Sequence, residues 1–299
     1  MLALSESGAI AGSVTGGCIE PALVVEAEAV LAGGAARVLT YGIPDDAAFE
    51  IGLACGGTVA LVLAELDSSL VAPLTAAVEA DRPVALALDV TGENIGRQRL
   101  LDRDDELAGR LLAAGEHGLV STASETVFVL SFAPRPQLYL LGAIDHAAAL
   151  VGVGQLLGYR VTVCDARAAF VTRERFPHAD ELVVDWPDRF LRRARPDERS
   201  AVCVLTHDEK FDVPALLAAL DSPALYIGAM GSLTTTAERE ERLRAEGVTD
   251  ADLARIHAPI GLAIGARSPA EVAVAIGAQL VEASSAVRRG VAGRATVLA

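Results

Sequence analysis

Short runs of apolar residues dominate the first part of the chain. Residues 19–34, IEPALVVEAEAVLAGG, space their apolar side chains at helical intervals and end in two glycines, a common helix stop. Other runs carry the β-branched and aliphatic residues typical of strands, at 36–42, 57–66, 83–90 and 125–132. Strands that follow one another, with a helix ahead of them, predict an α+β domain.

The pattern changes at FAPRPQ, residues 132–137, where two prolines favour an extended linker. Beyond it, strand and helix signals alternate. We expect a helix at 145–158, further helical segments after it, and strands at 137–142, 159–165, 200–206 and 224–228. This rhythm predicts an α/β protein in which an N-terminal α+β domain, residues 1–133, precedes a C-terminal Rossmann-like domain with a doubly wound parallel sheet, residues 137–299.

The composition limits the kinds of partner that the protein is expected to bind. The 299 residues are 52% hydrophobic and 22% charged, as in a compact globular protein, and carry a formal net charge of −15. Such a chain repels phosphates, so neither nucleic acid nor an anionic membrane is expected as a partner. Apolar stretches stop short of a membrane span, and the first residues lack a signal-peptide pattern. With four cysteines in no disulfide or zinc pattern and an Ala- and Arg-rich composition, we expect a bacterial cytoplasmic protein.

Two of the cysteines lie beside pairs of glycines. Cys18 follows one pair and Cys55 precedes the other, so a ligand can come close to either thiol. Cys164 and Cys203 lie in predicted strands and are expected to be small core residues. We predict a reactive or metal-facing role for Cys18 or Cys55. The cofactor-binding candidates of the first domain are Gly16, Gly17, Cys18, Cys55, Gly56 and Gly57.

Cys18 is the stronger candidate of the two. A helix expected to start at Ile19 or Glu20 places this thiol at a helix N-terminus, where the dipole favours the thiolate. Pro21 suits the first turn of that helix, since its missing N–H has no helical partner to lose there. The Glu20 carboxylate is expected to offset part of the effect of the dipole on the thiol.

The first turn of the second domain invites comparison with a dinucleotide-binding turn. Gly142 occupies the first glycine position of that fingerprint, but the second is Ile144, whose side chain is expected where the phosphate would lie. Asp145 adds a negative charge at the helix start. Asp165 stands where an acidic residue would bind ribose. A Rossmann-like sheet with a degenerate turn is therefore favoured over tight NAD(P) binding.

Further candidates follow the later strands. His207 and Asp208 come at the carboxyl end of a predicted strand, where they could hold a metal, move a proton or make ordinary loop hydrogen bonds. The YIGAMGS stretch could present N–H groups to a phosphate or form a plain turn. Ser268 and Glu271 form a capping box. The other candidates of this group are Gly228, Gly231, Ser232, Gly261 and Gly265.

Taken in order, these motifs resemble those of the XdhC family, the xanthine dehydrogenase accessory proteins. In the first domain the matching stretches are GSVTGGCIE (12–20) and GLACGG (52–57). In the second domain they are CDAR (164–167), VLTHDEKFD (204–212), YIGAMGS (226–232) and PIGLAIGARSPAEVAVAI (259–276). The resemblance covers nearly the whole chain.

The resemblance implies a dedicated chaperone rather than an enzyme. Family members bind the molybdopterin form of the molybdenum cofactor, protect it while its terminal sulfur is installed, and insert it into an apo molybdenum hydroxylase such as xanthine dehydrogenase. A cysteine desulfurase-type sulfur donor and a homodimer are further implied partners. The resemblance also implies that the candidate residues bind the cofactor and that Cys18 and Cys55 face the metal, since molybdenum accepts soft sulfur ligands.

Two departures from the family pattern accompany the resemblance. Family members carry a Pro-Arg stretch ahead of the first motif, which here begins at residue 12, so either the start is misassigned or the chain is a shortened form. The Gly-Ala-Gly-His turn of the family is replaced by Gly142, Ala143, Ile144 and Asp145. The alternatives are an NAD(P)-dependent oxidoreductase that uses the second domain, against which Ile144 argues, and a family member that keeps only a scaffold role.

Overall fold

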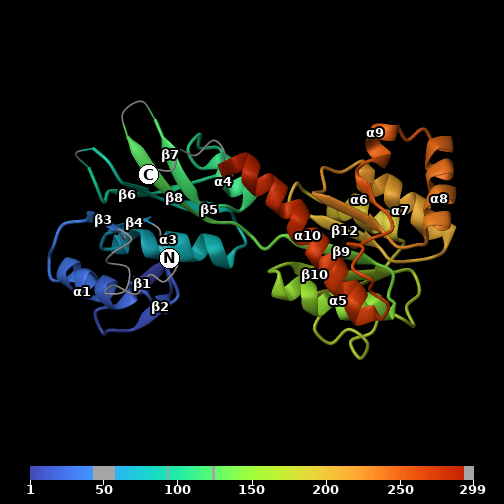
Figure 1. Cartoon of the computed structure of the whole chain (residues 1–299), viewed down its shortest axis with the longest axis horizontal. Helices are drawn as coiled ribbons and strands as arrows, with labels where there is room; N and C mark the ends of the chain where they lie inside the picture. Colours follow the sequence, from blue (N-terminus) through green and yellow to red (C-terminus); the bar gives the residue numbers. More distant parts are fainter. Residues whose placement is uncertain (43–57, 93, 123–124, 293–299) are drawn as a thin grey trace. The chain divides into compact units, whose positions relative to one another are not determined.

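The computed structural model describes residues 1–42, 58–92, 94–122 and 125–292 (Figure 1). The chain divides into two compact units, Met1–Pro134 and Arg135–Gly290. The second unit begins inside the FAPRPQ stretch, where the prolines keep the backbone out of a helix.

The first unit is built on antiparallel strands. Within its described part, a four-stranded sheet has the order β6-β5-β8-β7, and two hairpins pair β1 with β2 and β3 with β4. The strands are β1 (Leu2–Leu4), β2 (Ile10–Gly12), β3 (Arg37–Gly42), β4 (Thr58–Leu63), β5 (Val84–Asp89), β6 (Gln98–Leu101), β7 (Gly118–Ser121) and β8 (Thr126–Phe132). The helices are α1 (Glu20–Leu31), α3 (Ser68–Glu79) and α4 (Gly109–Ala114). This unit is α+β, as the sequence predicts.

Helix α1 buries one side on the β3–β4 hairpin. Ile19 and Leu23 form the centre of a small apolar cluster, and the side chains packed against it include Leu39 of β3 and Leu61 of β4. The helix ends as predicted, because Gly33 adopts a φ of +95° that favours glycine. The packing of α1 on the hairpin fixes the position of the residues just before the helix, Cys18 among them.

The second unit contains a six-stranded parallel sheet among its described residues, with the order β11-β10-β9-β12-β13-β14. The strands are β9 (Gln137–Leu141), β10 (Arg160–Asp165), β11 (Glu181–Val184), β12 (Ala201–Val204), β13 (Tyr226–Ala229) and β14 (Ile256–His257). The helices are α5 (Asp145–Leu156), α6 (Pro187–Ala194), α7 (Glu209–Leu220), α8 (Leu233–Ala245), α9 (Asp250–Leu253) and α10 (Pro269–Ala292). The chain starts at the centre, winds outward, returns and winds the other way, so the prediction of a Rossmann-like doubly wound sheet is confirmed.

Two apolar cores cover the two faces of this sheet. Alternate residues of β9 point to opposite faces, so Leu138 and Leu140 join one core and Tyr139 and Leu141 the other. Residues of α5 and α10 complete the first core, and residues of α6 and α7 complete the second. This two-sided burial explains why the strands of the second unit are nearly continuous apolar runs.

The cysteines of the sheet are core residues, as predicted. Cys164 and Cys203 are fully buried, on β10 and β12 respectively. Burial raises the pKa of the Cys164 thiol to about 12, and its Sγ lies 3.5 Å from the carbonyl oxygen of Asp185. Neither thiol is therefore suited to bind a ligand at neutral pH.

In the part of the chain that the structure describes, no helix is long and apolar enough to cross a membrane.

Gly142 makes the close approach between β9 and the segment after β12 possible. Its φ is +118°, and a Cβ on this residue would lie 2.8 Å from Cγ2 of Thr206. Replacing Gly142 by Ala should therefore lower the free energy of unfolding of the second unit by about 2 kcal/mol or more. The measurement is urea unfolding followed by the fluorescence of Trp186, the only tryptophan in the sequence.

Gly152→Ala is the matched control. Gly152 lies on α5, and a Cβ there would meet nothing within 4 Å, so this variant should be more stable than the wild type by about 0.5–1 kcal/mol. Equal unfolding midpoints for the two variants would contradict the role given to Gly142.

Candidate functional site

The carboxyl ends of the parallel strands bring several candidate residues to one edge of the sheet. Cys164 of β10 pairs with Leu141 of β9, which pairs with Val204 of β12, and Val204 pairs with Ala229 of β13. The residues that come next in each strand therefore lie along the same edge. This edge carries Gly142, Asp165, Thr206, His207, Asp208, Gly231 and Ser232. In a doubly wound sheet, ligands bind here, next to the point between β9 and β12 where the strand order reverses.

Asp165 ties the end of β10 to the turn after β9. Its Oδ2 accepts a hydrogen bond from the Ala143 N–H at 2.9 Å and one from Arg167 Nη2 at 2.7 Å, and its Oδ1 accepts from the N–H and the Nε of Arg167. Burial alone would raise the pKa of Asp165, but these bonds outweigh it, and the pKa is lowered. The carboxylate expected to bind ribose is thus ionised and already occupied by residues of the chain.

The turn after β9 also uses its own N–H groups. Gly142 donates to the Cys164 carbonyl at 2.8 Å, Ala143 donates to Asp165, and Ile144 donates to the Gly142 carbonyl at 3.0 Å. The Ile144 side chain packs against the core that contains β9 and α5 rather than over the turn. These three N–H groups are therefore engaged within the chain, and the Ile144 side chain contacts the core.

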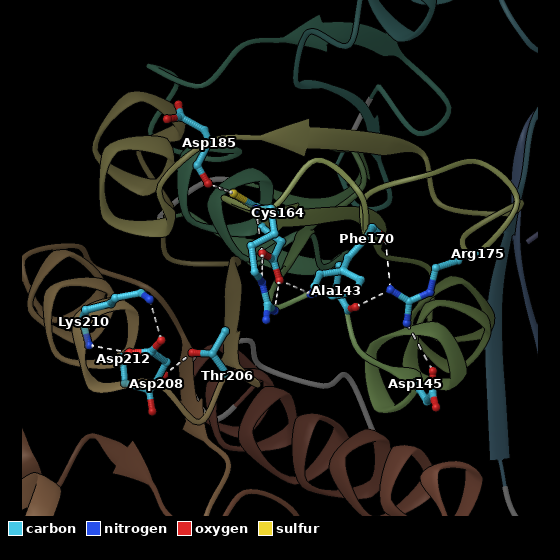
Figure 2. Close-up of polar contacts among 12 residues, drawn as sticks. Ala143, Asp145, Cys164, Phe170, Arg175, Asp185, Thr206, Asp208, Lys210 and Asp212 are labelled. Atoms are coloured by element: carbon cyan, nitrogen blue, oxygen red, sulfur yellow. Dashed lines mark hydrogen bonds and ion pairs between the residues drawn. The ribbon is translucent and has the colours of Figure 1, made fainter.

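Arg175 closes the outer side of this turn. Its guanidinium donates to the Ala143 carbonyl at 2.8 Å and to Asp145 Oδ1 at 3.3 Å (Figure 2). Asp145, expected to repel a bound anion, is therefore paired with a cation. The sequence alone did not identify Arg175, because it lies far along the chain from the turn that it contacts.

Asp208 caps the helix that follows β12. Its Oδ1 accepts from the Lys210 N–H at 3.2 Å and its Oδ2 lies 2.8 Å from Lys210 Nζ (Figure 2). These interactions with Lys210 lower the pKa of the Asp208 carboxyl. His207 is exposed beside it. Asp208 thus caps α7, and the imidazole of His207 is open to solvent.

A buried ion pair beneath these loops was not expected from the sequence. Asp212 of α7 accepts a hydrogen bond from Thr206 Oγ1, and its Oδ2 lies 3.1 Å from Arg239 Nη2 of α8. Arg239 also donates to the Met230 carbonyl at 2.7 Å, so it connects the segments after β12 and β13. Asp212 could have been suspected, because it directly follows the apolar Phe211 and lies within the core-facing part of its helix.

Two of the candidate glycines permit contacts within the protein. A Cβ on Gly228 would lie 2.5 Å from Ile260 and 2.7 Å from the Tyr226 hydroxyl, and one on Gly261 would lie 3.2 Å from Ala275. The Gly261 N–H donates to Gln279 Oε1 at 2.8 Å. Close packing within the protein therefore explains why Gly228 and Gly261 are glycines, without a ligand.

Of the remaining candidates of the second unit, Ser232 and Gly265 are exposed, whereas a Cβ on Gly231 would lie 3.3 Å from Thr235. Ser232 caps α8, because its Oγ accepts from the Thr235 N–H at 3.1 Å. Gly265, with a φ of +80°, has no described residue within 4 Å of an added Cβ and borders a hollow of about 350 Å³.

The predicted capping box at the start of α10 is confirmed, since the Glu271 N–H donates to Ser268 Oγ and Glu271 Oε2 accepts from the Ser268 N–H.

The cysteine loop of the first unit lies at the start of α1. Gly16 and Gly17 have φ values of +78° and +119°, and a Cβ on either would meet no described residue within 4 Å, so as far as the described residues go the space beside Cys18 is open on their side. Cys18 itself is partly buried and packs against the Ile19 and Leu23 cluster. The other candidates of the first domain, Cys55, Gly56 and Gly57, lie outside the described residues.

No group of three or more His, Cys, Asp and Glu side chains suited to a metal ion occurs among the described residues. Cys18 is thus a single soft donor in a glycine-lined position.

Two family models match this chain, one in each of the two units. The family model described as the XdhC Rossmann domain matches residues 138–280, and the model described as the XdhC and CoxI family matches residues 1–42. A crystal structure of a xanthine dehydrogenase from Bacillus halodurans has the same fold, with a TM-score of 0.72 and 24% identity over 95% of this chain and 85% of that one.

Two curated relatives extend the comparison. The chain is 30% identical over 156 residues to a probable xanthine dehydrogenase subunit of Bacillus subtilis, a match that covers 52% of this chain and 45% of that protein. It is 27% identical over 282 residues to the molybdenum cofactor insertion chaperone PaoD of Escherichia coli, covering 93% of this chain and 76% of that protein. The chain thus matches less than half the length of the Bacillus subtilis protein and about three quarters of PaoD.

The occupied turn after β9 leads to a prediction about dinucleotides. NAD and NADP should bind weakly, because the donors of Gly142, Ala143 and Ile144 are used within the chain and Asp165 is paired with Arg167. Titration calorimetry with each dinucleotide is the measurement. A low-micromolar dissociation constant would contradict the prediction and favour the oxidoreductase alternative.

Ile144→Gly tests the effect of the Ile144 side chain separately. If the side chain blocks the phosphate approach, this variant should bind NAD more tightly than the wild type. If the satisfied donors are what prevents binding, affinity should stay unchanged.

Proposed function

Because the chain belongs to the XdhC family, we propose that it binds the molybdopterin form of the molybdenum cofactor as cargo and inserts it into an apo molybdenum hydroxylase such as xanthine dehydrogenase. The observation that carries this proposal is the similarity to a molybdenum cofactor insertion chaperone over 93% of the chain. In this role the protein holds and transfers the cofactor, and it also protects the cofactor while the terminal sulfur is installed.

The cysteine loop supports the proposal in chemical terms. Molybdenum accepts soft sulfur ligands, and Cys18 offers a thiol at the start of α1. Within the described part of the first unit, Gly16 and Gly17 leave open space on one side, which a bulky pterin needs. Cys18 is accordingly the residue proposed to face the metal, together with Cys55.

The carboxyl edge of the second unit supplies the other proposed contacts. Exposed polar groups there include His207, Asp208 and Ser232, and Gly231 with a φ of +154° presents its backbone beside the start of α8. Backbone N–H groups at such a helix start favour an anionic group such as the phosphate of the pterin. We propose the exposed His207, Asp208 and Ser232, together with Gly231, as the cofactor contacts of this edge. The other expected residues, Gly142, Asp165, Gly228 and Gly261, already make contacts within the protein, and Gly265 lies at the hollow beside the start of α10.

The proposed partners follow from the transfer reaction. The cargo must pass to an apo molybdenum hydroxylase, and the terminal sulfur must come from a donor of the cysteine desulfurase type. We also propose a homodimer as the working form.

Cys18→Ser is the variant that tests this function. It keeps the size of the side chain and removes the soft ligand, so retention of cofactor and its delivery to an apo hydroxylase should fall by more than about tenfold while the protein stays folded. Pterin fluorescence of the purified variant and reactivation of the apo hydroxylase are the measurements.

Cys164→Ser is the control for this experiment. Cys164 is fully buried on β10, so its replacement should lower the thermal stability more than it lowers cofactor delivery. Delivery by Cys18→Ser at the wild-type rate, with unchanged thermal stability, would mean that the Cys18 thiol only packs against its neighbours.

A further inference from the structure

The Glu20 carboxylate is the anchor of the loop that precedes Cys18. Both of its oxygens accept hydrogen bonds from this loop, and most of the donors are backbone N–H groups. Oε1 accepts from Ser13 Oγ at 2.7 Å and from the N–H groups of Val14 at 2.9 Å, Thr15 at 2.8 Å and Gly16 at 3.1 Å. Oε2 accepts from Thr15 Oγ1 at 2.9 Å and from the Gly17 N–H at 2.9 Å. The loop thus wraps around one carboxylate.

The conformation of the loop explains why the donors converge. Gly16 and Gly17 both have positive φ, which turns successive N–H groups towards one point, a geometry that suits an anion. The loop hydroxyls add to it, since Ser13 Oγ accepts from the Gly16 N–H at 3.0 Å and Thr15 Oγ1 accepts from the Ile19 N–H at 3.3 Å. Hydrogen bonds from the Thr15 N–H, then the Ser13 hydroxyl and the Val14 N–H, lower the pKa of Glu20 strongly.

This arrangement fixes Cys18 from both sides. The residue before it, Gly17, is bound to Glu20, and the residue after it, Ile19, is 1% exposed and belongs to the apolar cluster of α1. The backbone of Cys18 lies between these two fixed points. We infer that Glu20 is a positioning residue, which holds the Ser13–Gly17 loop so that the Cys18 thiol is presented to the cofactor in one geometry. This inference rests on the proposed function of Cys18.

The inference differs from the electrostatic effect expected from the sequence. A carboxylate beside a thiol would act on it through its charge, but both Glu20 oxygens are turned towards loop donors that balance part of that charge. A positioning role changes how readily the thiolate reacts. A charge role changes only the pH at which the thiolate forms.

The variants can be graded by the hydrogen bonds they retain. Glu20→Gln can keep its carbonyl oxygen at the place of Oε1, but its amide then meets the Gly17 N–H, which needs an acceptor. Glu20→Ala removes every acceptor. Glu28→Gln is the matched control, because Glu28 lies on the same helix, is exposed, and its side chain accepts no hydrogen bond from the described residues.

The first measurement is the rate of alkylation of Cys18 by iodoacetamide as a function of pH, read from the Cys18 peptide by mass spectrometry. The rate at high pH, where the thiol is fully ionised, should rise severalfold in Glu20→Gln and on the order of tenfold in Glu20→Ala, because the loop no longer restrains the thiol. Hydrogen exchange of the Val14–Gly17 amides should accelerate in the same order. Glu28→Gln should match the wild type in both.

The second measurement is cofactor retention by the same variants, which should fall in the order wild type, Glu20→Gln, Glu20→Ala. Hydrogen-exchange protection of the β5 and β8 amides shows whether the first unit of each variant is folded. If Glu20→Ala is not folded, the comparison of Glu20→Gln with the wild type decides whether Glu20 is a positioning residue. A shift of the pH midpoint with an unchanged limiting rate would overturn the inference, because Glu20 would then act through charge alone. A changed limiting alkylation rate together with wild-type cofactor retention would also overturn the inference.

The two proposals can fail separately. Undiminished retention by Cys18→Ser would remove the proposed role of the thiol, whatever the alkylation rates of the Glu20 variants. An unchanged limiting rate in both Glu20 variants, together with loss of retention in Cys18→Ser, would keep the proposed function and remove Glu20 as a positioning residue.

Discussion

The pairing of β9 with β12 is the constraint on which the second unit depends. These two strands lie side by side at the centre of the sheet although a long stretch of sequence separates them, and the chain leaves the pair in opposite directions. The Leu205 N–H continues the pairing to the Leu141 carbonyl at 2.8 Å, immediately before the close contact of Gly142 with Thr206. All the carboxyl-edge loops start from strands whose order this pair sets.

The loops at that edge are joined to one another by buried polar contacts. Asp165 connects the β10 segment to the β9 turn, and Arg239 connects the segments after β12 and β13. A buried carboxylate or guanidinium is stable only when it is paired, so these contacts hold the loops in one arrangement. A ligand that binds at this edge meets a preformed surface, in which the N–H groups of Gly142, Ala143 and Ile144 are already engaged within the chain.

The elements that the sequence predicted well are the long or strongly patterned ones. Helix α1, helix α5 and the apolar strands of the second unit were recognisable because their apolar spacing extends over many residues. The strands β1, β2, β6, β7, β11 and β14 were missed, because each has four residues or fewer and is too short to show an apolar pattern. The strand order could be expected only from the general rule for alternating strands and helices.

The sequence could single out candidate residues, but it could not show which residues they contact. The glycine pairs and the cysteine mark the loop before α1, but the sequence does not reveal that Glu20 folds back onto the N–H groups of residues 14–17. The capping box at Ser268 was foreseen because its donor and acceptor keep a fixed spacing. In contrast, Arg167 and Arg175 come close to the β9 turn only through the fold, so a single carboxylate such as Asp165 looked free.

The central claim is that this chain carries the molybdenum cofactor. The most direct measurement is anaerobic purification of the full chain after co-expression with the proteins of molybdenum cofactor synthesis, followed by pterin fluorescence and metal analysis. We expect pterin and molybdenum to co-purify with the protein in stoichiometric amounts. Folded protein that contains neither, prepared alongside a cofactor-loaded hydroxylase from the same cells, would contradict the claim.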